Sequence, residues 1–223
     1  MSEIKITVSD EIFRACPEFC FSAIICRVKN SPHNEKLWKE VEVFSTDFRA
    51  RYKMEDINKR KAIFATRQVY KNLGKDPNRY RPSAEALCRR IIKGINLYPI
   101  NTLVDLINFV SLKTGYSIGG FDYDKIQGNL VLGIGTAGEK FEAIGRGLLN
   151  IEGLPVYRDE VGGIGTPTSD EERTKITGET TRLLMIINGY SGREGLEEAT
   201  DFSVKLLKKY AEAEEIILFS TKS

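Results

Sequence analysis

The segment Asn101–Ile126, NTLVDLINFVSLKTGYSIGGFDYDKI, decides the fold because it runs from an amphipathic stretch directly into a glycine turn. Its apolar residues recur at the i, i+3, i+4, i+7 spacing of one helix face. They predict a helix over 101–114 whose buried stripe consists of Leu103, Leu106, Ile107 and Val110. A helix with a second, polar face that leads at once into a glycine turn favours a pocket over a plain core.

The polar face of this expected helix contains Asn101, Asp105 and Asn108. In a partly desolvated cleft, each asparagine offers both a hydrogen-bond donor and an acceptor. The plain alternative has Asn101 as the N-cap, Asp105 in the first turn and Asn108 exposed to solvent. Spacing alone favours this alternative, because polar residues on a helix are exposed in most proteins.

Length and composition predict one continuous domain over 1–223, with 41% hydrophobic and 29% charged residues. The net charge of +2 gives no general attraction for a nucleic-acid backbone, so any RNA contact requires a local basic patch. The chain has no apolar run of membrane-spanning length and no signal-peptide pattern in MSEIKITVSDEIF. A cytoplasmic location without a membrane partner is therefore expected.

Cysteine and histidine usage argues against a metal or redox centre. Cys16, Cys20, Cys26 and Cys88 form no CxxC pair, and the only histidine is His33 in a polar SPHNEK stretch. The thiols are expected to be reduced and mostly buried. No metal and no cofactor are expected.

Patterning and turn residues predict a mixture of helices and strands along the chain. The expected strands cover 4–8, 19–28, 180–187 and 215–219, with further short strands in the glycine-rich middle, and the first two are expected to pair. Helices are expected from a Ser31–Pro32 start to about Arg51, over 58–73 with a stop at Gly74, from Pro82 to Gly94, and after a capping box at 191–194. An α+β fold follows.

The densest basic cluster lies in RYRPSAEALCRRIIKG, residues 79–94. One interpretation is a Glu85–Arg89 pair at i,i+4 with the other charges solvated. The other is an anion site, where arginine side chains gather near the free N–H groups of a helix start. The sequence leaves these two interpretations about even.

The run SDEERTKITGET, residues 169–180, concentrates acids and hydroxyls between two expected strands. Glu171 or Glu172 could hold a water molecule as a hydrogen-bond acceptor, with Arg173 and Thr174 binding a polar substrate group. A solvated charged loop is the alternative, and the sequence alone favours it.

Several of these motifs together resemble a known module, the third and fourth domains (B3/B4) of the phenylalanyl-tRNA synthetase beta subunit. The match runs from residue 79 to residue 189, with 1–78 and 190–223 as packed extensions. It is carried by Arg81-Pro82-Ser83 with Glu85, Leu87, Arg89 and Arg90, by Asn101–Asp105 with Asn108, by Gly115, Phe121-Asp122 and Asp124–Ile126, by Glu139, and by Glu172–Thr174 with Glu179-Thr180.

The resemblance implies a layered, β-rich α+β fold with packed helices and a pocket between them. In the synthetase this module binds tRNA and hydrolyses tRNA-Phe wrongly charged with tyrosine. By position, Asn108 and Glu172 (Glu171 if the gap slides) match residues that line the editing pocket of the family. With them we expect Glu172 to be catalytic, Asp105, Asn108, Gly119 and Thr174 to bind substrate, and Arg81, Ser83, Arg89, Arg90 and Arg173 to face RNA or another anion. Gly119 stands where the family has a histidine, and Ser117 replaces the preceding proline.

The resemblance therefore implies a stand-alone, synthetase-like module whose partner is tRNA or aminoacyl-tRNA. If it is an enzyme, it is expected to be an aminoacyl-tRNA deacylase that edits in trans. It is not expected to charge tRNA, because nothing in the chain resembles the synthetase active site. The alternative is a binding protein for an amino acid or another polar metabolite without catalytic activity, and a protein–protein adaptor is also open.

Overall fold

The computed structural model describes residues 4–221. Its helices are α1 (Asp10–Ala15), α2 (Glu35–Arg51), α3 (Lys61–Asn72), α4 (Ser83–Ile92), α5 (Thr102–Thr114) and α6 (Leu196–Tyr210), with 3-10 turns η1 (Met54–Lys59), η2 (Tyr123–Lys125) and η3 (Glu172–Thr174). The strands are β1 (Ile6–Val8), β2 (Cys20–Arg27), β3 (Ile118–Asp122), β4 (Leu130–Ile134), β5 (Glu142–Ala143), β6 (Gly147–Leu148), β7 (Pro155–Arg158), β8 (Gly163–Gly165), β9 (Arg182–Gly189) and β10 (Glu214–Ser220).

The main sheet is antiparallel and has the strand order β10-β2-β9-β3. The second sheet has the order β1-β4-β7-β8, and β5 and β6 form a separate hairpin. The expected pairing of 4–8 with 19–28 is wrong, because β1 runs parallel to β4 in the second sheet. β2 is buried along nearly its whole length, and both of its edges are occupied, by β9 and by β10.

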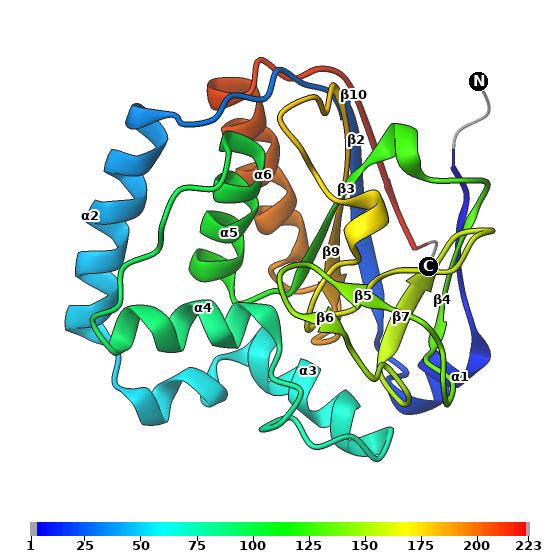
Figure 1. Cartoon of the computed structure of the whole chain (residues 1–223). Helices are drawn as coiled ribbons and strands as arrows, with labels where there is room; N and C mark the ends of the chain where they lie inside the picture. The colour runs from blue at the N-terminus through cyan, green and yellow to red at the C-terminus, as the bar shows by residue number, and fades with distance from the viewer. Residues whose placement is uncertain (1–3, 222–223) are drawn as a thin grey trace.

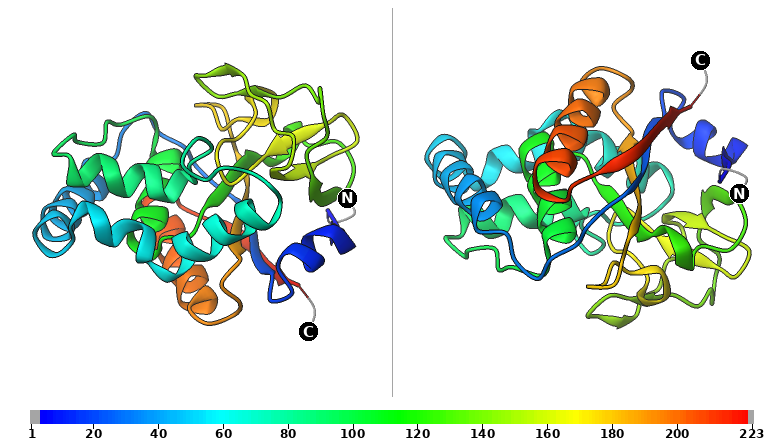
Figure 2. Two further views of the ribbon diagram at one scale, coloured as in Figure 1. Left: turned by 90° about the horizontal axis from the view of Figure 1, so that it is seen from below. Right: turned by 90° about the horizontal axis from the view of Figure 1, so that it is seen from above.

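The chain forms three layers, which Figure 1 shows from the side and Figure 2 from below and above. Helices α2, α5 and α6 cover one face of the main sheet, and the second sheet lies on the other side. Apolar side chains fill both gaps: Ile24, Leu106 and Met185 belong to the helical side, and Phe121 and Leu132 belong to the side between the sheets. The expected layered α+β fold is confirmed. Within residues 4–221, no helix has both the length and the apolar character needed to span a bilayer.

Helix α5 confirms the prediction made from the opening segment. The Asn101 side chain accepts a 3.0 Å hydrogen bond from the Val104 N–H and caps the helix, as the plain interpretation expects. All four residues of the predicted apolar stripe are buried. Gly115 ends the helix with φ +87°, a conformation that glycine adopts without a steric penalty.

Two expected helix starts are wrong. Helix α2 begins at Glu35, where the Asn34 side chain accepts a hydrogen bond from the Leu37 N–H. Ser31 does not cap it, because its hydroxyl lies 2.6 Å from the Thr102 hydroxyl at the start of α5. Helix α6 follows Gly195, and no side chain caps it. The capping box expected at 191–194 is replaced by a glycine with φ +83°.

All four cysteines are buried and free, as the sequence predicts. Burial raises the pKa of Cys26 to about 12 and the pKa of Cys16 to about 11. Because the thiolate is the reactive form, these side chains behave as small apolar residues at neutral pH.

Candidate functional site

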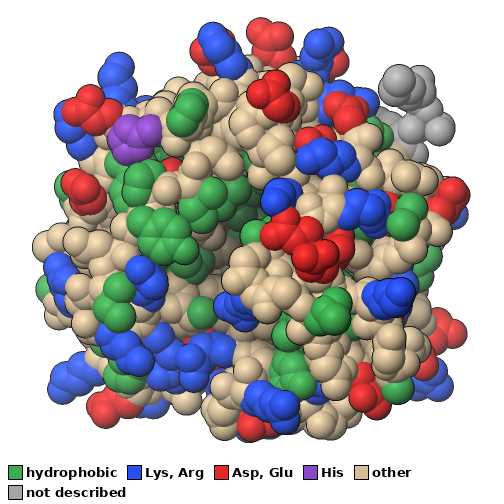
Figure 3. Space-filling model, in the orientation of Figure 1, with side chains coloured by type: hydrophobic (Ala, Val, Ile, Leu, Met, Phe, Trp, Pro, Cys, Tyr) green, Lys and Arg blue, Asp and Glu red, His purple; other side chains and the backbone are tan. Residues whose placement is uncertain are grey.

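A cavity of about 360 Å³ lies between α5, β3 and the loop that precedes β9. Figure 3 shows a hollow near the centre of the face that is turned toward the viewer in Figure 1, between the helical part and the β-rich part. The wall of this cavity combines six aliphatic residues and one glycine with seven polar residues, among them Asn108, Ser111, Asp170 and Lys175. The remaining lining residues are Ser83, Ile100, Val104, Ile107, Ile118, Gly120, Ile144, Thr166, Ser169 and Ile176.

Gly120 keeps this cavity open. A Cβ atom at this position would lie 2.4 Å from Cδ1 of Ile107 and 3.1 Å from Cδ1 of Ile176. Any other residue would therefore displace two isoleucine side chains of the cavity wall and change the shape of the cavity.

Asp170 is the acidic side chain of the cavity. Its Oδ2 accepts a 3.2 Å hydrogen bond from the Gly120 backbone N–H. A Cβ atom on Gly165 would lie 2.8 Å from its Oδ1, so the absence of a side chain there makes room for the carboxyl. Asp170 stays partly accessible through the cavity although its carboxyl lies deep among neighbouring atoms.

Burial raises the pKa of Asp170 to about 7, and the Gly120 hydrogen bond offsets only part of this effect. The group therefore exchanges a proton near neutral pH, which is the behaviour required of a general acid or base. A titratable carboxyl in a small, partly apolar cavity is a site candidate on physical grounds alone.

Sequence reasoning missed Asp170, Ser111 and Lys175. Asp170 stands beside Glu171 and Glu172 in an acidic run, and nothing in the run itself distinguishes the three. The available signal is the set of glycines around it, because a buried carboxyl needs small neighbours and a free backbone N–H, which Gly120 and Gly165 supply.

Two of the expected site residues, Asn108 and Ser83, line the cavity. Asn108 is half-buried on α5, so its expected exposure in the plain interpretation does not hold.

Asp105 is buried elsewhere, where it accepts hydrogen bonds from the Trp38 indole at 2.7 Å and from the Ile100 N–H at 3.0 Å. Burial raises the pKa of Asp105. Asp105 does not line the cavity, but its bond to the Ile100 N–H holds a residue of the cavity wall in the loop before α5.

Glu172 is not among the residues that line the cavity. One of its carboxylate oxygens forms an ion pair with Lys175, and the other accepts a 3.3 Å hydrogen bond from the Gly145 N–H. The hydrogen bond with Lys175 lowers the pKa of Glu172, which keeps it ionised. Glu172 thus connects the β5–β6 hairpin to a lysine of the cavity wall.

Three other expected site residues point elsewhere. A Cβ atom on Gly119 would lie 2.7 Å from the ring of Phe121 and 3.8 Å from Oδ1 of Asp170, on the opposite face of β3 from the Ile107 side marked by Gly120. Thr174 is fully buried, and within the described part of the chain its hydroxyl has no hydrogen-bond partner. Arg173 forms two hydrogen bonds with the Asp159 carboxylate, at 2.9 and 2.8 Å.

The basic cluster is organised around Glu85, whose side chain is fully buried. Arg67 and Arg89 donate to it at 2.8 and 2.7 Å, and Arg81 lies 3.7 Å away. The expected Glu85–Arg89 pair is confirmed, but it lies inside the protein and not on a solvated face. Arg90 donates to the Asn96 carbonyl oxygen.

One carboxylate therefore neutralises only part of the positive charge of three guanidinium groups. The exposed Arg81 and the partly exposed Arg89 keep part of this positive charge at the surface. The partly exposed Arg90 adds to it. We call these three residues the arginine surface. Figure 3 shows blue side chains gathered at the lower left of the hollowed face, over α4 of Figure 1.

Comparison with known proteins agrees with this architecture. A crystal structure of an N-terminal fragment of the phenylalanyl-tRNA synthetase beta subunit from Pyrococcus horikoshii is similar, with a TM-score of 0.52 and 14% identity over 100% of this chain and 55% of that chain. At this level of identity, the likeness shows a shared fold.

Sequence relatives include the phenylalanine–tRNA ligase beta subunits of Bartonella henselae, 38% identical over 98 residues, and of Bartonella quintana, 34% identical over 92 residues. These segments cover 43% and 38% of this chain but only 12% and 11% of the relatives. The sequence model of the B3/4 domain matches residues 65–212. The resemblance seen in the motifs is confirmed, and the chain belongs to the B3/4 domain family.

Proposed function

We propose that this chain, a synthetase-like module, binds the aminoacyl end of a tRNA and hydrolyses the ester bond of a mischarged aminoacyl-tRNA in trans. The observation that carries the proposal is the shared cavity of Asn108 and Asp170. Its volume of about 360 Å³ is near the lower end of the ~300–1,000 Å³ range of ligand pockets. Such a cavity suits an amino acid, with the nucleic acid remaining outside.

The lining supports a ligand with an apolar side chain and a polar end. Ile107, Ile118 and Ile176 offer aliphatic contact, while Asn108 offers both a donor and an acceptor. In this proposal Asn108 orients the amino acid, and Lys175 favours negative charge that develops on the ester carbonyl oxygen.

Asp170 takes the role of general base. It accepts a proton from a water molecule as the water oxygen attacks the ester carbonyl carbon. The bond from this carbon to the ribose oxygen then breaks, and Asp170 gives the proton it took from water to the leaving ribose oxygen, which restores the carboxylate. A pKa of about 7 suits this role, because a large fraction of the carboxyl is ionised at neutral pH. Glu172 supports the site indirectly, by holding Lys175.

The tRNA itself would lie along the arginine surface. Ser83 belongs both to the first turn of α4 and to the cavity wall, so the cavity and the basic charge are continuous. Arginine side chains bind phosphate oxygens through paired N–H groups. Aminoacyl-tRNA as the substrate also implies a cytoplasmic setting.

The test is a deacylation assay with a panel of mischarged tRNAs. Asp170→Asn should lower the rate about 100-fold or more, the usual contribution of a general base. Glu172→Gln should lower it only a few-fold, and the exposed Glu179→Gln is the matched control. Absence of turnover on every tRNA, or equal loss in Asp170→Asn and Glu179→Gln, would contradict the enzymatic proposal.

The second candidate is a binding protein for a free amino acid or similar metabolite. It is favoured by the small net charge of +2 and by the internal use of Arg67 and Arg89 to neutralise Glu85. Binding of tRNA should weaken steeply as salt is added, whereas a ligand held in a cavity should be much less sensitive. A ligand that raises the melting temperature while tRNA fails to bind at low salt would establish this candidate.

A further inference from the structure

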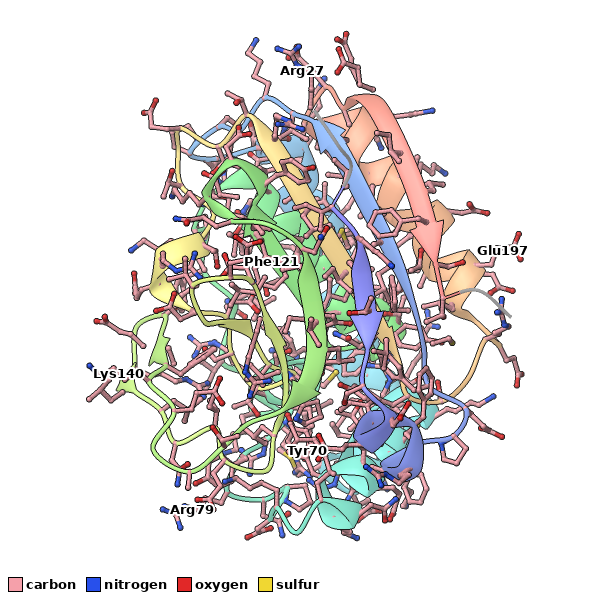
Figure 4. All side chains as sticks on the ribbon, turned by 90° about the vertical axis from the view of Figure 1, so that its right-hand side faces the viewer. Arg27, Tyr70, Arg79, Phe121, Lys140 and Glu197 are labelled. Atoms are coloured by element: carbon pink, nitrogen blue, oxygen red, sulfur yellow. The ribbon has the colours of Figure 1, made fainter. Side chains whose placement is uncertain are left out.

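Strand β10 forms an open edge of the main sheet. It pairs with β2 on one side and is the outermost strand of the order β10-β2-β9-β3. Figure 4 shows it along the outer margin of the sheet, and the view from above in Figure 2 shows the same. Leu218 is 52% exposed and Ile217 is 37% exposed. Sheet edges with exposed apolar residues are templates for pairing with another chain.

The usual protections of an edge strand are missing from the second half of β10. Residues 217–220, ILFS, contain no proline, lysine or other charged residue, and the only register shift comes before them, between Glu214 and Ile217. Edge strands are normally short, charged or bulged. This half-strand is regular and apolar.

The hydrogen-bond pattern tells which backbone groups are free. Thr221 donates its N–H to the Phe21 carbonyl oxygen, and its hydroxyl accepts from the Phe21 N–H. In an antiparallel ladder, hydrogen-bonded and non-bonded pairs alternate. The backbone N–H and C=O groups of Phe219 and Ile217 therefore face β2, and those of Leu218 and Ser220 face the open edge.

The open edge is complementary to itself. If two copies pair antiparallel with Leu218 on the two-fold axis, Leu218 exchanges both hydrogen bonds with Leu218 of the second copy. Ile217 then lies opposite Phe219 of the second copy, a β-branched and aromatic combination that stabilises sheets.

The charges at the two strand ends are also complementary. Glu214 and Glu215 lie at the beginning of β10; Glu214 forms no ion pair within residues 4–221, and Glu215 forms only an exposed 3.5 Å pair with Arg27. At the other end, Arg193 donates to the Thr221 carbonyl oxygen and is exposed. The ladder shifts register between Glu214 and Ile217, so the same two-fold pairing brings the acidic beginning of β10 as a whole toward Thr221 and Arg193 of the second copy.

We propose that β10 is a dimerisation edge, through which two copies of this chain join their main sheets into one continuous antiparallel sheet. The inference does not depend on the proposed hydrolysis or on tRNA. A short strand pair buries a modest area, so the dimer should depend on concentration. The cavity opens on the face shown in Figure 3, whereas β10 lies at the edge of the sheet, so both copies keep an open cavity.

The test is sedimentation or light scattering of the full chain over a concentration series. The wild-type chain should form a reversible dimer. Leu218→Pro removes an N–H that faces the open edge and leaves the bonds to β2 intact, as proline on an edge strand can. The dissociation constant should rise at least about tenfold, because two symmetric hydrogen bonds are lost. Leu218→Val keeps the N–H and should retain the dimer.

A charge exchange provides an independent test that does not alter the backbone. Arg193→Glu and Glu215→Arg should each weaken the dimer, and the double variant should recover affinity. If circular dichroism shows that Leu218→Pro does not fold, the charge-exchange variants alone test whether β10 forms the dimer contact. A wild-type chain that stays monomeric at its highest attainable concentration overturns the proposal, as does a dimer unaffected by the proline and charge variants.

Discussion

The carboxyl of Asp170 accepts a 3.2 Å hydrogen bond from the backbone N–H of Gly120. Gly120 belongs to β3, the edge strand at the opposite end of the main sheet from β10. One contact therefore satisfies an edge N–H group and fixes an ionisable side chain in the cavity. Because the carboxyl is buried, its proton affinity is coupled to folding.

The contribution of Asp170 to the free energy of unfolding should fall as pH rises from about 4 to about 7. The pKa of Asp170 is raised to about 7 in the folded protein, so in this window the folded state binds more protons than the unfolded state. Asp170→Asn removes this cost and can still accept the Gly120 N–H. Its gain in unfolding free energy at pH 8 should be at most about 4 kcal/mol, from roughly 1.4 kcal/mol per pKa unit.

Denaturant unfolding at pH 4.5 and pH 8 measures this effect. The difference between Asp170→Asn and the wild-type chain should be large at pH 8 and small at pH 4.5. Glu179→Asn, at an exposed position, is the control. An equal difference at both pH values would mean that Asp170 titrates normally.

Filling the cavity should block ligand binding more than it harms folding. In Gly120→Ala, the new Cβ meets the ends of the Ile107 and Ile176 side chains, which line the cavity and must shift. Overpacking of this kind costs about 1–3 kcal/mol in stability. Binding of any cavity ligand should become undetectable in thermal-shift or calorimetric titration.

Gly178→Ala is the matched control for Gly120→Ala, because nothing lies within 4 Å of the added Cβ. It should bind ligand as the wild-type chain does. Unchanged affinity in Gly120→Ala would show that the ligand binds outside the cavity.

How much the sequence predicts depends on whether the feature is local. The helix over 101–114 and the strand over 19–28 follow from periodicity, because each carries its own apolar pattern. The pairing of β1 with β4 does not follow from periodicity. It joins residues more than 120 positions apart through backbone hydrogen bonds, which do not depend on the identity of the side chains. Asp170 meets the Gly120 N–H inside the cavity, whereas Glu172, two residues later in the same acidic run, pairs with Lys175 outside it. This distinction arises from tertiary packing and has no local signature.

The Glu172–Gly145 hydrogen bond should restrain the β5–β6 hairpin. Arg146 lies at the exposed tip of this hairpin and is a site for trypsin. Glu172→Ala removes the hydrogen bond to the Gly145 N–H and the ion pair with Lys175, so the hairpin should open more often. Trypsin cleavage after Arg146, followed by mass spectrometry, should become a few-fold faster. Glu179→Ala should cleave at the wild-type rate, and equal rates in all three proteins would rule out the restraint.

Loss of Glu85 should be among the most damaging single changes to this chain. Its buried carboxylate pairs with Arg67, of which only 11% is exposed, and with Arg89. Glu85→Ala leaves these guanidinium groups close together without a counter-charge, which costs about 3–5 kcal/mol in unfolding free energy. Glu85→Gln should cost less, because the amide oxygen can still accept one N–H. Exposed Glu42→Ala should cost almost nothing, and a loss in Glu85→Ala as small as that in Glu42→Ala would mean that the arginines find other partners.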